Sequence, residues 1–273
     1  MHPILFEILG RPIATYGLFM IIGALAAWFL VRLLGGKKDM HVPMAFLICI
    51  CGGLVGMVLL RPITRIPEII IRWDVIRTLP FEVAVYYIFG EMVFYGGLIG
   101  GTIALLIYCK GYKLPVLPMA DLFAPATAVA HAFGRIGCFF GGCCYGIHVD
   151  ASHPFAVVFP DTGLGAVPYG VPLLATQLIE AACLFTIAAI LSVIYKKTTL
   201  KGLTLCMYGV LYSILRFVLE YFRGDPIRGV YGPFSTSQYI SIAIFIICTT
   251  LLCILLKNAC NKSETLDNTD KME

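Results

Sequence analysis

The chain has 273 residues, of which 59% are hydrophobic and only 13% are charged, and its formal net charge is +4. Soluble domains carry about a quarter charged residues, so this composition excludes an ordinary soluble protein and indicates a polytopic membrane protein. The positive charge is small and dispersed, which gives no argument for nucleic-acid binding. We therefore predict an all-α membrane protein with no nucleic-acid partner.

Apolar segments long enough to cross a bilayer recur along the chain. A span needs about 20 mainly apolar residues, and the hydropathy of the sequence indicates seven such segments. The fourth is short and ends at Arg135, and the sixth carries charge at its end. In chain order the predicted spans are 14–35, 43–61, 93–110, 118–135, 172–195, 203–222 and 236–256.

This pattern predicts one transmembrane domain over residues 1–257, followed by a disordered polar cytoplasmic tail over 258–273. All ten lysines lie in alternate connections or in the tail, and so on one side of seven spans. The positive-inside rule assigns that side to the cytoplasm. Nine of the ten arginines lie on or near the other side, where several are candidate site residues. We expect an external N-terminus, a cytoplasmic C-terminus, and longer external connections at 62–92 and 136–171.

One arginine and several glycines lie together in residues 131–146, beside the fourth predicted span. An arginine at membrane depth is costly and is by default a functional-site hypothesis. The guanidinium of Arg135 matches phosphate oxygens bidentately, and the abundant phosphate of a membrane belongs to lipid headgroups. The alternative is a glycine-rich helix end from which Arg135 snorkels to the interface.

His131 lies four residues before Arg135, so a continuous helix would place both on one face. A histidine there is a candidate general base, because its ordinary pKa is near neutrality. The alternative is a hydrogen bond between helices with no role in chemistry.

Arg216, Glu220 and Arg223 follow an i, i+4, i+7 spacing, which predicts that they share one helical face. A structural ion-pair ladder would have the same spacing, but the surplus positive charge favours an anion site. Tyr16 and Tyr95 begin the first and third predicted spans on the same outer side. Alone, Tyr16 would be an interface anchor, and the glycines after Tyr95 would serve helix packing.

Three of the eleven cysteines, Cys138, Cys143 and Cys144, lie in the glycine-rich stretch. Their C-x4-C-C spacing is a poor match to zinc sites, which usually use paired Cys-x-x-Cys or Cys/His spacings, and we expect no metal. We expect these thiols to face outward, where two of them can form a disulfide.

These motifs resemble the signatures of the prolipoprotein diacylglyceryl transferase family. The resemblance runs through nearly the whole chain and implies a bacterial plasma-membrane enzyme. Such an enzyme moves the diacylglyceryl group of phosphatidylglycerol onto the lipobox cysteine thiol of a preprolipoprotein and releases glycerol 1-phosphate. The matching residues are Pro3-Ile-Leu-Phe, Tyr16-Gly17, Tyr95-Gly-Gly-Leu-Ile-Gly100, Ala120-Asp121, Ala124-Pro125, Gly134-Arg-Ile-Gly137, Gly146, Gln177-Leu-x-Glu180, Arg216-Phe-x-x-Glu220-x-x-Arg223 and Ser237-Gln238.

The resemblance also implies roles for individual residues. Arg135 and Arg216 would clamp the lipid phosphate and stabilise the leaving group, and Tyr16 would hydrogen-bond the headgroup. Phosphatidylglycerol, preprolipoprotein signal peptides and membrane lipids are the expected partners, with no cofactor. The candidate catalytic residues are Arg135, Arg216, Tyr95 and His131. The candidate substrate-binding residues are Tyr16, Arg135, Gly137, Cys138, Gly146, Tyr212, Arg216, Glu220 and Arg223.

The chain departs from the family pattern at three positions. Tyr95 stands where the family has histidine, Cys138 where it has asparagine, and Cys143 where it has glutamate. Two alternatives therefore stay open: a non-catalytic phospholipid-binding paralogue, and a transferase of the same fold with a different acceptor, using Cys138 or Cys143 covalently.

Overall fold

The computed structural model describes residues 4–8, 11–35, 40–90, 94–161, 167–225 and 229–270. Within these ranges, six helices are long and apolar enough to cross a membrane, and a shorter apolar helix is a seventh. These helices coincide with the seven predicted spans, which confirms an all-α polytopic membrane protein. They are α1 (Thr15–Gly35), α2 (His41–Thr64), α6 (Phe94–Gly111), α7 (Val116–Gly141), α8 (Thr176–Lys197), α9 (Leu203–Leu219) and α10 (Thr236–Asp270).

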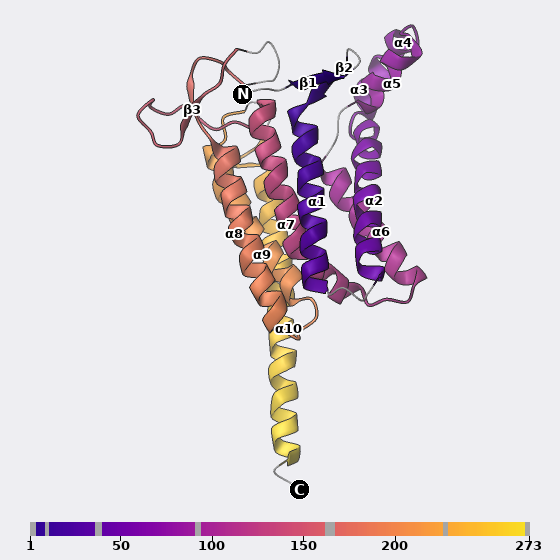
Figure 1. The fold of residues 1–273 in the computed structure, drawn as a ribbon, viewed down its shortest axis with the longest axis vertical. Helices are drawn as coiled ribbons and strands as arrows, with labels where there is room; N and C mark the ends of the chain where they lie inside the picture. Colours follow the sequence, from indigo (N-terminus) through magenta and orange to yellow (C-terminus); the bar gives the residue numbers. More distant parts are fainter. Residues whose placement is uncertain are drawn as a thin grey trace. The chain divides into compact units, whose positions relative to one another are not determined.

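The chain forms two compact units, one of residues 1–34 and 120–273 and the other of residues 35–119. The first unit contains α1, most of α7, and α8 to α10, whereas the second contains α2 to α6 (Figure 1). The prediction of a single domain over 1–257 and a disordered tail over 258–273 stays a prediction; α10 runs on as a helix to Asp270.

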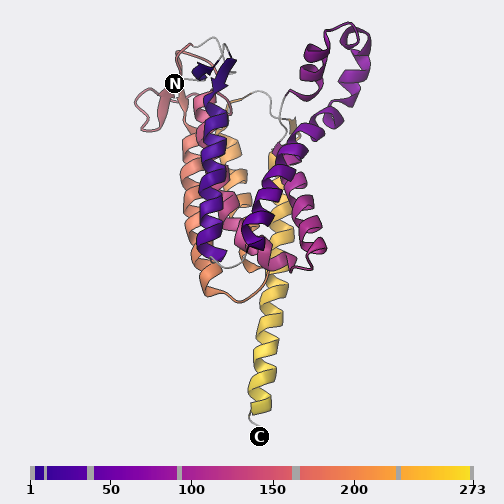
Figure 2. The same cartoon turned by 45° about the vertical axis from the view of Figure 1, so that its right-hand side comes forward.

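In the second unit, α2 and α6 pack along a line of glycines. A Cβ atom added to Gly96 would overlap the carbonyl oxygen of Gly56, and one added to Gly100 would overlap that of Gly52. Two backbones approach this closely only where side chains are absent, as is common between membrane helices. Figure 2 shows the two helices side by side. The packing role predicted for the glycines after Tyr95 is therefore confirmed.

Three short helices follow α2, where the sequence predicted only an external connection. They are α3 (Ile66–Ile71), α4 (Trp73–Ile76) and α5 (Phe81–Phe89). Arg61, buried near the end of α2, donates from Nη2 to the carbonyl oxygen of Tyr87 at 3.2 Å. The Tyr87 hydroxyl donates to Glu68 at 3.0 Å. These bonds tie α5 to α2 and α3, and they give a structural role to Arg61 and to Glu68.

In the first unit, α7, α8 and α9 share an apolar core. Ala128 of α7 and Ile187, Ala188 and Leu191 of α8 are buried together, with partly buried side chains of α9 against them. Figure 1 shows α8 and α9 running side by side, with α10 extending past them toward the C-terminus. The polar residues of the site therefore project from helices that are already fixed by apolar packing.

Asp121 of α7 caps the start of α9 from a distance in sequence. Its Oδ1 accepts a hydrogen bond from the Leu205 amide at 2.9 Å, and its Oδ2 accepts one from the Gly202 amide. Gly202 has φ +92° and no side chain with which to cap the helix itself. A buried carboxylate at a helix N-terminus satisfies free amides and complements the helix dipole. This contact fixes where α9 begins and thus the height at which Arg216 projects.

Short antiparallel strand pairs precede or connect helices of the first unit, and none of them was predicted. A hairpin of β1 (Ile4–Ile8) and β2 (Arg11–Ala14) precedes α1. In the segment after α7, β3 (Ala156–Val158) pairs with β4 (Pro172–Leu174), and before α10, β5 (Val230–Tyr231) pairs with β6 (Phe234–Ser235). The β3–β4 pair leads directly into α8, which supplies one carboxylate of the site.

Candidate active site

A buried glutamate of α8 joins two of the predicted site residues of α7. Oε1 of Glu180 lies 3.0 Å from Nε of Arg135 and 4.0 Å from Nε2 of His131. Glu180 is 3% exposed. His131 and Arg135 thus share one face, as predicted. The predicted span ended at Arg135, but α7 continues to Gly141, because Arg135 has a carboxylate partner inside the bundle and does not need to end the helix.

Glu180 belongs to the Gln177-Leu-x-Glu180 motif, but it was not predicted to be a site residue. The signal that identifies it is a carboxylate inside an apolar span, a placement that is rare without a partner. The same motif supplies Gln177, which is 1% exposed and donates from Nε2 to the Cys143 carbonyl oxygen at 2.8 Å.

The second predicted arginine is held between α9 and α10. Nη2 of Arg216 lies 2.8 Å from Oε2 of Glu220 and donates to Oγ of Ser237 at 3.0 Å. Nη1 of Arg216 is buried and has no hydrogen-bond partner among the residues that the structure describes. A buried donor is rarely left unpaired in a folded protein. This N–H group is therefore available to an acceptor on a ligand.

His131 and Tyr212 connect the two arginines. Their rings meet edge to face with centroids 5.0 Å apart, and Tyr212 lies one turn before Arg216 on α9. The charges of both Arg135 and Arg216 act on His131. The structure therefore brings together five predicted residues, namely His131, Arg135, Tyr212, Arg216 and Glu220.

Arg223 lies outside the helix, which corrects the prediction of one face for Arg216, Glu220 and Arg223. α9 ends at Leu219, a 3-10 turn η1 covers Glu220–Phe222, and Arg223 is extended with φ −82°. Because the helix stops, Arg223 turns to Asp225 and donates to it twice, at 2.8 Å and 2.6 Å. Burial lowers the pKa of Arg223, but these bonds outweigh burial and raise it above its ordinary value.

Gly146 lies where three backbone segments meet. It pairs with Arg223 in an antiparallel bridge, and its amide donates to the Leu174 carbonyl oxygen at 3.1 Å. A Cβ atom at this position would overlap that oxygen. Gly146 therefore allows the close approach that positions Arg223, and direct substrate contact by Gly146 stays a prediction.

Tyr16 lies over the glycine-rich part of α7. A Cβ atom on Gly137 would lie 3.0 Å from Cδ2 of Tyr16 and 3.3 Å from Cβ of Phe19. Gly137 thus allows α1 to approach α7 and brings the half-exposed tyrosine beside this motif. Tyr95 is in α6 of the other unit, and its side chain lies outside the described residues.

Cys138, Cys143 and Cys144 meet at the end of α7. Their sulfur atoms all lie within 4.8 Å of one another, and all three cysteines are free. Hydrogen bonds from the Cys138 and Cys143 thiols lower the pKa of Cys144, and the charges of Arg223 and Arg135 act in the same direction.

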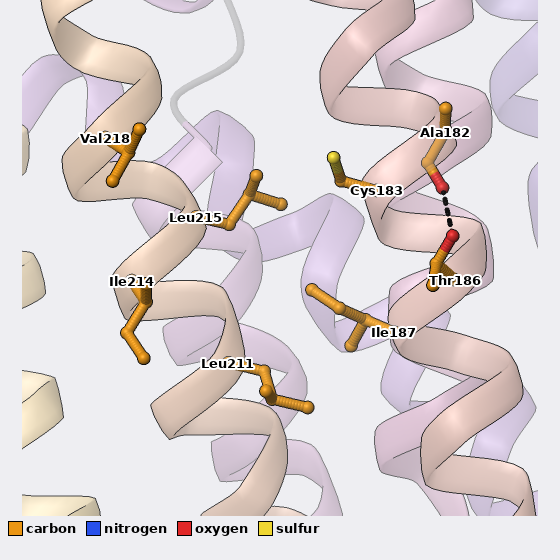
Figure 3. Close-up of a pocket in the computed structure, with 8 residues that line it drawn as sticks. All are labelled: Ala182, Cys183, Thr186, Ile187, Leu211, Ile214, Leu215 and Val218. Atoms are coloured by element: carbon orange, nitrogen blue, oxygen red, sulfur yellow. Dashed lines mark hydrogen bonds between the residues drawn. The ribbon is translucent and has the colours of Figure 1, made fainter.

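An apolar groove of about 500 Å³ lies between α8 and α9 (Figure 3). Cys183 follows Glu180 by three residues and Leu215 directly precedes Arg216, so two lining residues adjoin the charged cluster along their helices. The hydroxyl of Thr186 donates to the Ala182 carbonyl oxygen at 3.0 Å, which leaves the lining apolar. The lining residues are Ala182, Cys183, Thr186, Ile187, Leu211, Ile214, Leu215 and Val218.

The fold and the cluster together define a multi-pass membrane protein with a buried arginine centre beside an apolar groove. A family model described as prolipoprotein diacylglyceryl transferase matches residues 3–254. The chain therefore belongs to the prolipoprotein diacylglyceryl transferase family, as the resemblance predicted, and is a transferase of lipoprotein biosynthesis.

Relatives of similar length carry the family's name. A phosphatidylglycerol–prolipoprotein diacylglyceryl transferase of Clostridium tetani is 35% identical over 250 residues, covering 90% of this chain and 95% of the relative. A second one, of Clostridium perfringens, is 35% identical, covering 90% and 92%. A protein of the same name from Rickettsia rickettsii is 29% identical over 266 residues, covering 93% and 96%. The similarity thus extends over whole chains rather than one motif.

Proposed function

We propose that this protein transfers the diacylglyceryl group of phosphatidylglycerol to the lipobox cysteine thiol of preprolipoproteins. The sulfur attacks the glycerol carbon that carries the phosphate, an S–C bond forms, and the C–O bond breaks. The electron pair of that bond leaves with the phosphate oxygen, so glycerol 1-phosphate is released and the thiol loses its proton. The name of the relatives from Clostridium supports both substrates.

The unpaired Nη1 of Arg216 is the observation that carries this proposal. It is a buried cationic donor whose charge, like that of Arg135, acts on His131 and Tyr212, and the neighbouring Leu215 lines the apolar groove. An anionic headgroup satisfies the donor, and an acyl chain suits the groove between α8 and α9. In this arrangement both arginines hold the phosphate and stabilise the negative charge that develops on it. Glu180 and Glu220 fix the two guanidiniums, and Tyr16 bonds the headgroup.

We further propose that the enzyme is in the bacterial plasma membrane, with the N-terminus outside and the C-terminus in the cytoplasm. The lysine distribution supports this orientation. A membrane-impermeant maleimide applied to intact cells, with and without reductant, should label Cys143 or Cys144. Labelling of Cys260 alone, in the C-terminal part of α10, would indicate the opposite orientation.

The central experiment gives the purified protein phosphatidylglycerol vesicles and a lipobox peptide. Formation of the diacylglyceryl thioether, with equimolar glycerol 1-phosphate, is the expected result. A peptide with serine in place of the cysteine is the matched control. Lipid binding without transfer would instead identify the non-catalytic paralogue, and transfer to another nucleophile would identify a different acceptor.

The general base is tested separately, because Tyr95 replaces the histidine of the family pattern. If His131 is the base, His131→Gln lowers the rate and changes its pH profile. Full activity with an unchanged pH profile would show that His131 is not the base. Its role would then be limited to its contacts with Glu180 and Tyr212. A rise in activity in Tyr95→His would show that the native site works without a strong base at that position.

A further inference from the structure

The end of α7 brings two cysteines into contact through its backbone. Gly142 has φ +65°, and its amide donates to the carbonyl oxygen of Phe139. The amide of Cys143 donates to the carbonyl oxygen of Cys138 at 3.1 Å. This pair of bonds is a Schellman motif, which ends a helix and places the side chains five residues apart against each other. In most helices that contact is apolar. Here it joins the thiols of Cys138 and Cys143.

The third cysteine is fixed from α8. Cys144 has φ +59°, an uncommon conformation for a residue with a side chain, which the surrounding contacts must maintain. Thr176 donates to the carbonyl oxygen of Cys144 at 3.3 Å, and Gln177 donates to that of Cys143 at 2.8 Å. The positions of these thiols are therefore built into the fold.

The geometry of the three sulfur atoms suits a soft metal ion. Tetrahedral zinc with Zn–S bonds of about 2.3 Å needs sulfurs about 3.8 Å apart, and the three lie within 4.8 Å of one another. Three thiolates around Zn²⁺ leave one negative charge, and the Coulombic contacts of Arg135 and Arg223 with Cys144 complement it. The C-x4-C-C spacing argues against zinc only if residues 138–144 are assumed to form one continuous helix. The helix end and the left-handed residue remove that objection.

We propose that Cys138, Cys143 and Cys144 bind a zinc ion whose fourth coordination position is open to the acceptor thiol. Catalytic zinc sites keep three protein ligands and one open position, and a thiol that coordinates the metal is deprotonated. The acceptor's proton would pass to solvent. The thiolate would then form the S–C bond as the C–O bond to the phosphate breaks, glycerol 1-phosphate would leave with that electron pair, and the thioether product would leave the metal. The second half of this proposal rests on the proposed function. It supplies thiol activation in a chain that has Tyr95 in place of histidine.

The metal site is tested without turnover. The purified full-length protein, treated with chelator and reductant, should bind one Zn²⁺, and one Co²⁺ with the charge-transfer absorption of thiolate ligands. Cys138→Ser, Cys143→Ser and Cys144→Ser should each weaken binding by at least about 100-fold. Cys253→Ser, an exposed cysteine of α10 outside the site, is the matched control and should bind the metal normally. A disulfide among the three cysteines in freshly purified protein, or the same Co²⁺ spectrum in the serine variants, would overturn the site.

The acceptor position is tested on the Co²⁺-loaded wild-type protein, so variants that fail to fold do not affect it. A lipobox peptide should shift the Co²⁺ absorption, and its serine analogue should not. No shift with the cysteine peptide would overturn the open position. Full transfer activity in verified metal-free protein would also overturn it while leaving the proposed function intact. Metal binding with no transfer under any condition would count against the proposed function instead.

Discussion

Two glycine-rich segments of this chain look alike in sequence and differ in use. In α6, Gly96 and Gly100 bring its backbone against that of α2, and the helix carries no charged residue from Phe94 to Cys109. At the end of α7, Gly137 and Gly142 stand among Arg135 and the cysteines, where they admit Tyr16 and end the helix. Glycine at membrane depth thus serves packing in one helix and builds a site in the other.

The difference lies in what the glycines free the backbone to do. In α6 the absent Cβ atoms allow two helices to approach, and the gain is van der Waals contact. Beside Arg135 they allow a positive φ and close crossings that carry charged and nucleophilic groups. We therefore expect mutations in the two segments to separate into losses of stability and losses of chemistry.

The largest effect is expected for Arg135→Ala, which leaves Glu180 buried without its partner. Removing one member of a buried ion pair destabilises a protein by about 3–5 kcal/mol. The double variant Arg135→Ala/Glu180→Gln should recover much of that stability but no transfer activity. Thermal unfolding in detergent and the transfer assay measure the two effects. Recovery of activity in the double variant would reduce Arg135 to a structural role.

Arg216→Ala should lower transfer by about 100- to 1,000-fold, as for loss of one donor to a developing oxyanion. Arg216→Lys should rescue only part, because lysine lacks the bidentate fork. Arg77→Ala is the control, since its pair with Asp74 is exposed and of little energetic weight. Normal turnover by Arg216→Ala would show that Arg216 does not hold the phosphate.

Gly100→Ala tests the packing segment. Its Cβ atom would meet backbone atoms of Gly52 and Gly56, which cannot turn away, so overpacking should cost about 1–3 kcal/mol. Gly111→Ala, in the same helix, meets nothing within 4 Å and should be neutral. Equal melting temperatures for the two variants would contradict the close approach of α2 and α6.

Gly137→Ala is expected to have the smallest effect on stability and a clear effect on activity. The nearest atom to its Cβ, at 3.0 Å, belongs to the Tyr16 ring, which can move. The Tyr16 carbonyl oxygen and the Phe19 Cβ lie at 3.3 Å and need to shift only slightly, so the loss should stay near the lower end of about 1–3 kcal/mol. The displaced Tyr16 should lower transfer by about 10- to 100-fold. Gly141→Ala makes only an ordinary contact, 3.9 Å from Cβ of Tyr16, and should keep normal activity. A large drop in melting temperature without loss of rate would place Gly137 with the packing glycines.

Much of the fold followed from hydropathy, because a bilayer demands long apolar segments whose backbone is satisfied internally. Much of the charged cluster followed from helical spacing, which put His131 and Arg135 on one face. The placement of Arg223 was wrong, because a helix end depends on local hydrogen bonds that the i, i+7 rule does not include. Glu180 was missed as a site residue, since its partners lie on another helix.

The sequence by itself determined the class of protein, the number of apolar helices, the family and the two arginines. The class of protein and its apolar helices depend on composition and on hydropathy within one segment, whereas the family and the arginines depend on motifs that resemble those of the family along nearly the whole chain. Only the tertiary structure decided that Glu180 holds Arg135, that Asp121 caps α9, and that three thiols spaced C-x4-C-C converge. Helix packing and a residue in the left-handed conformation set the distances between these groups. The spacing of residues along the sequence specifies neither the packing nor that conformation.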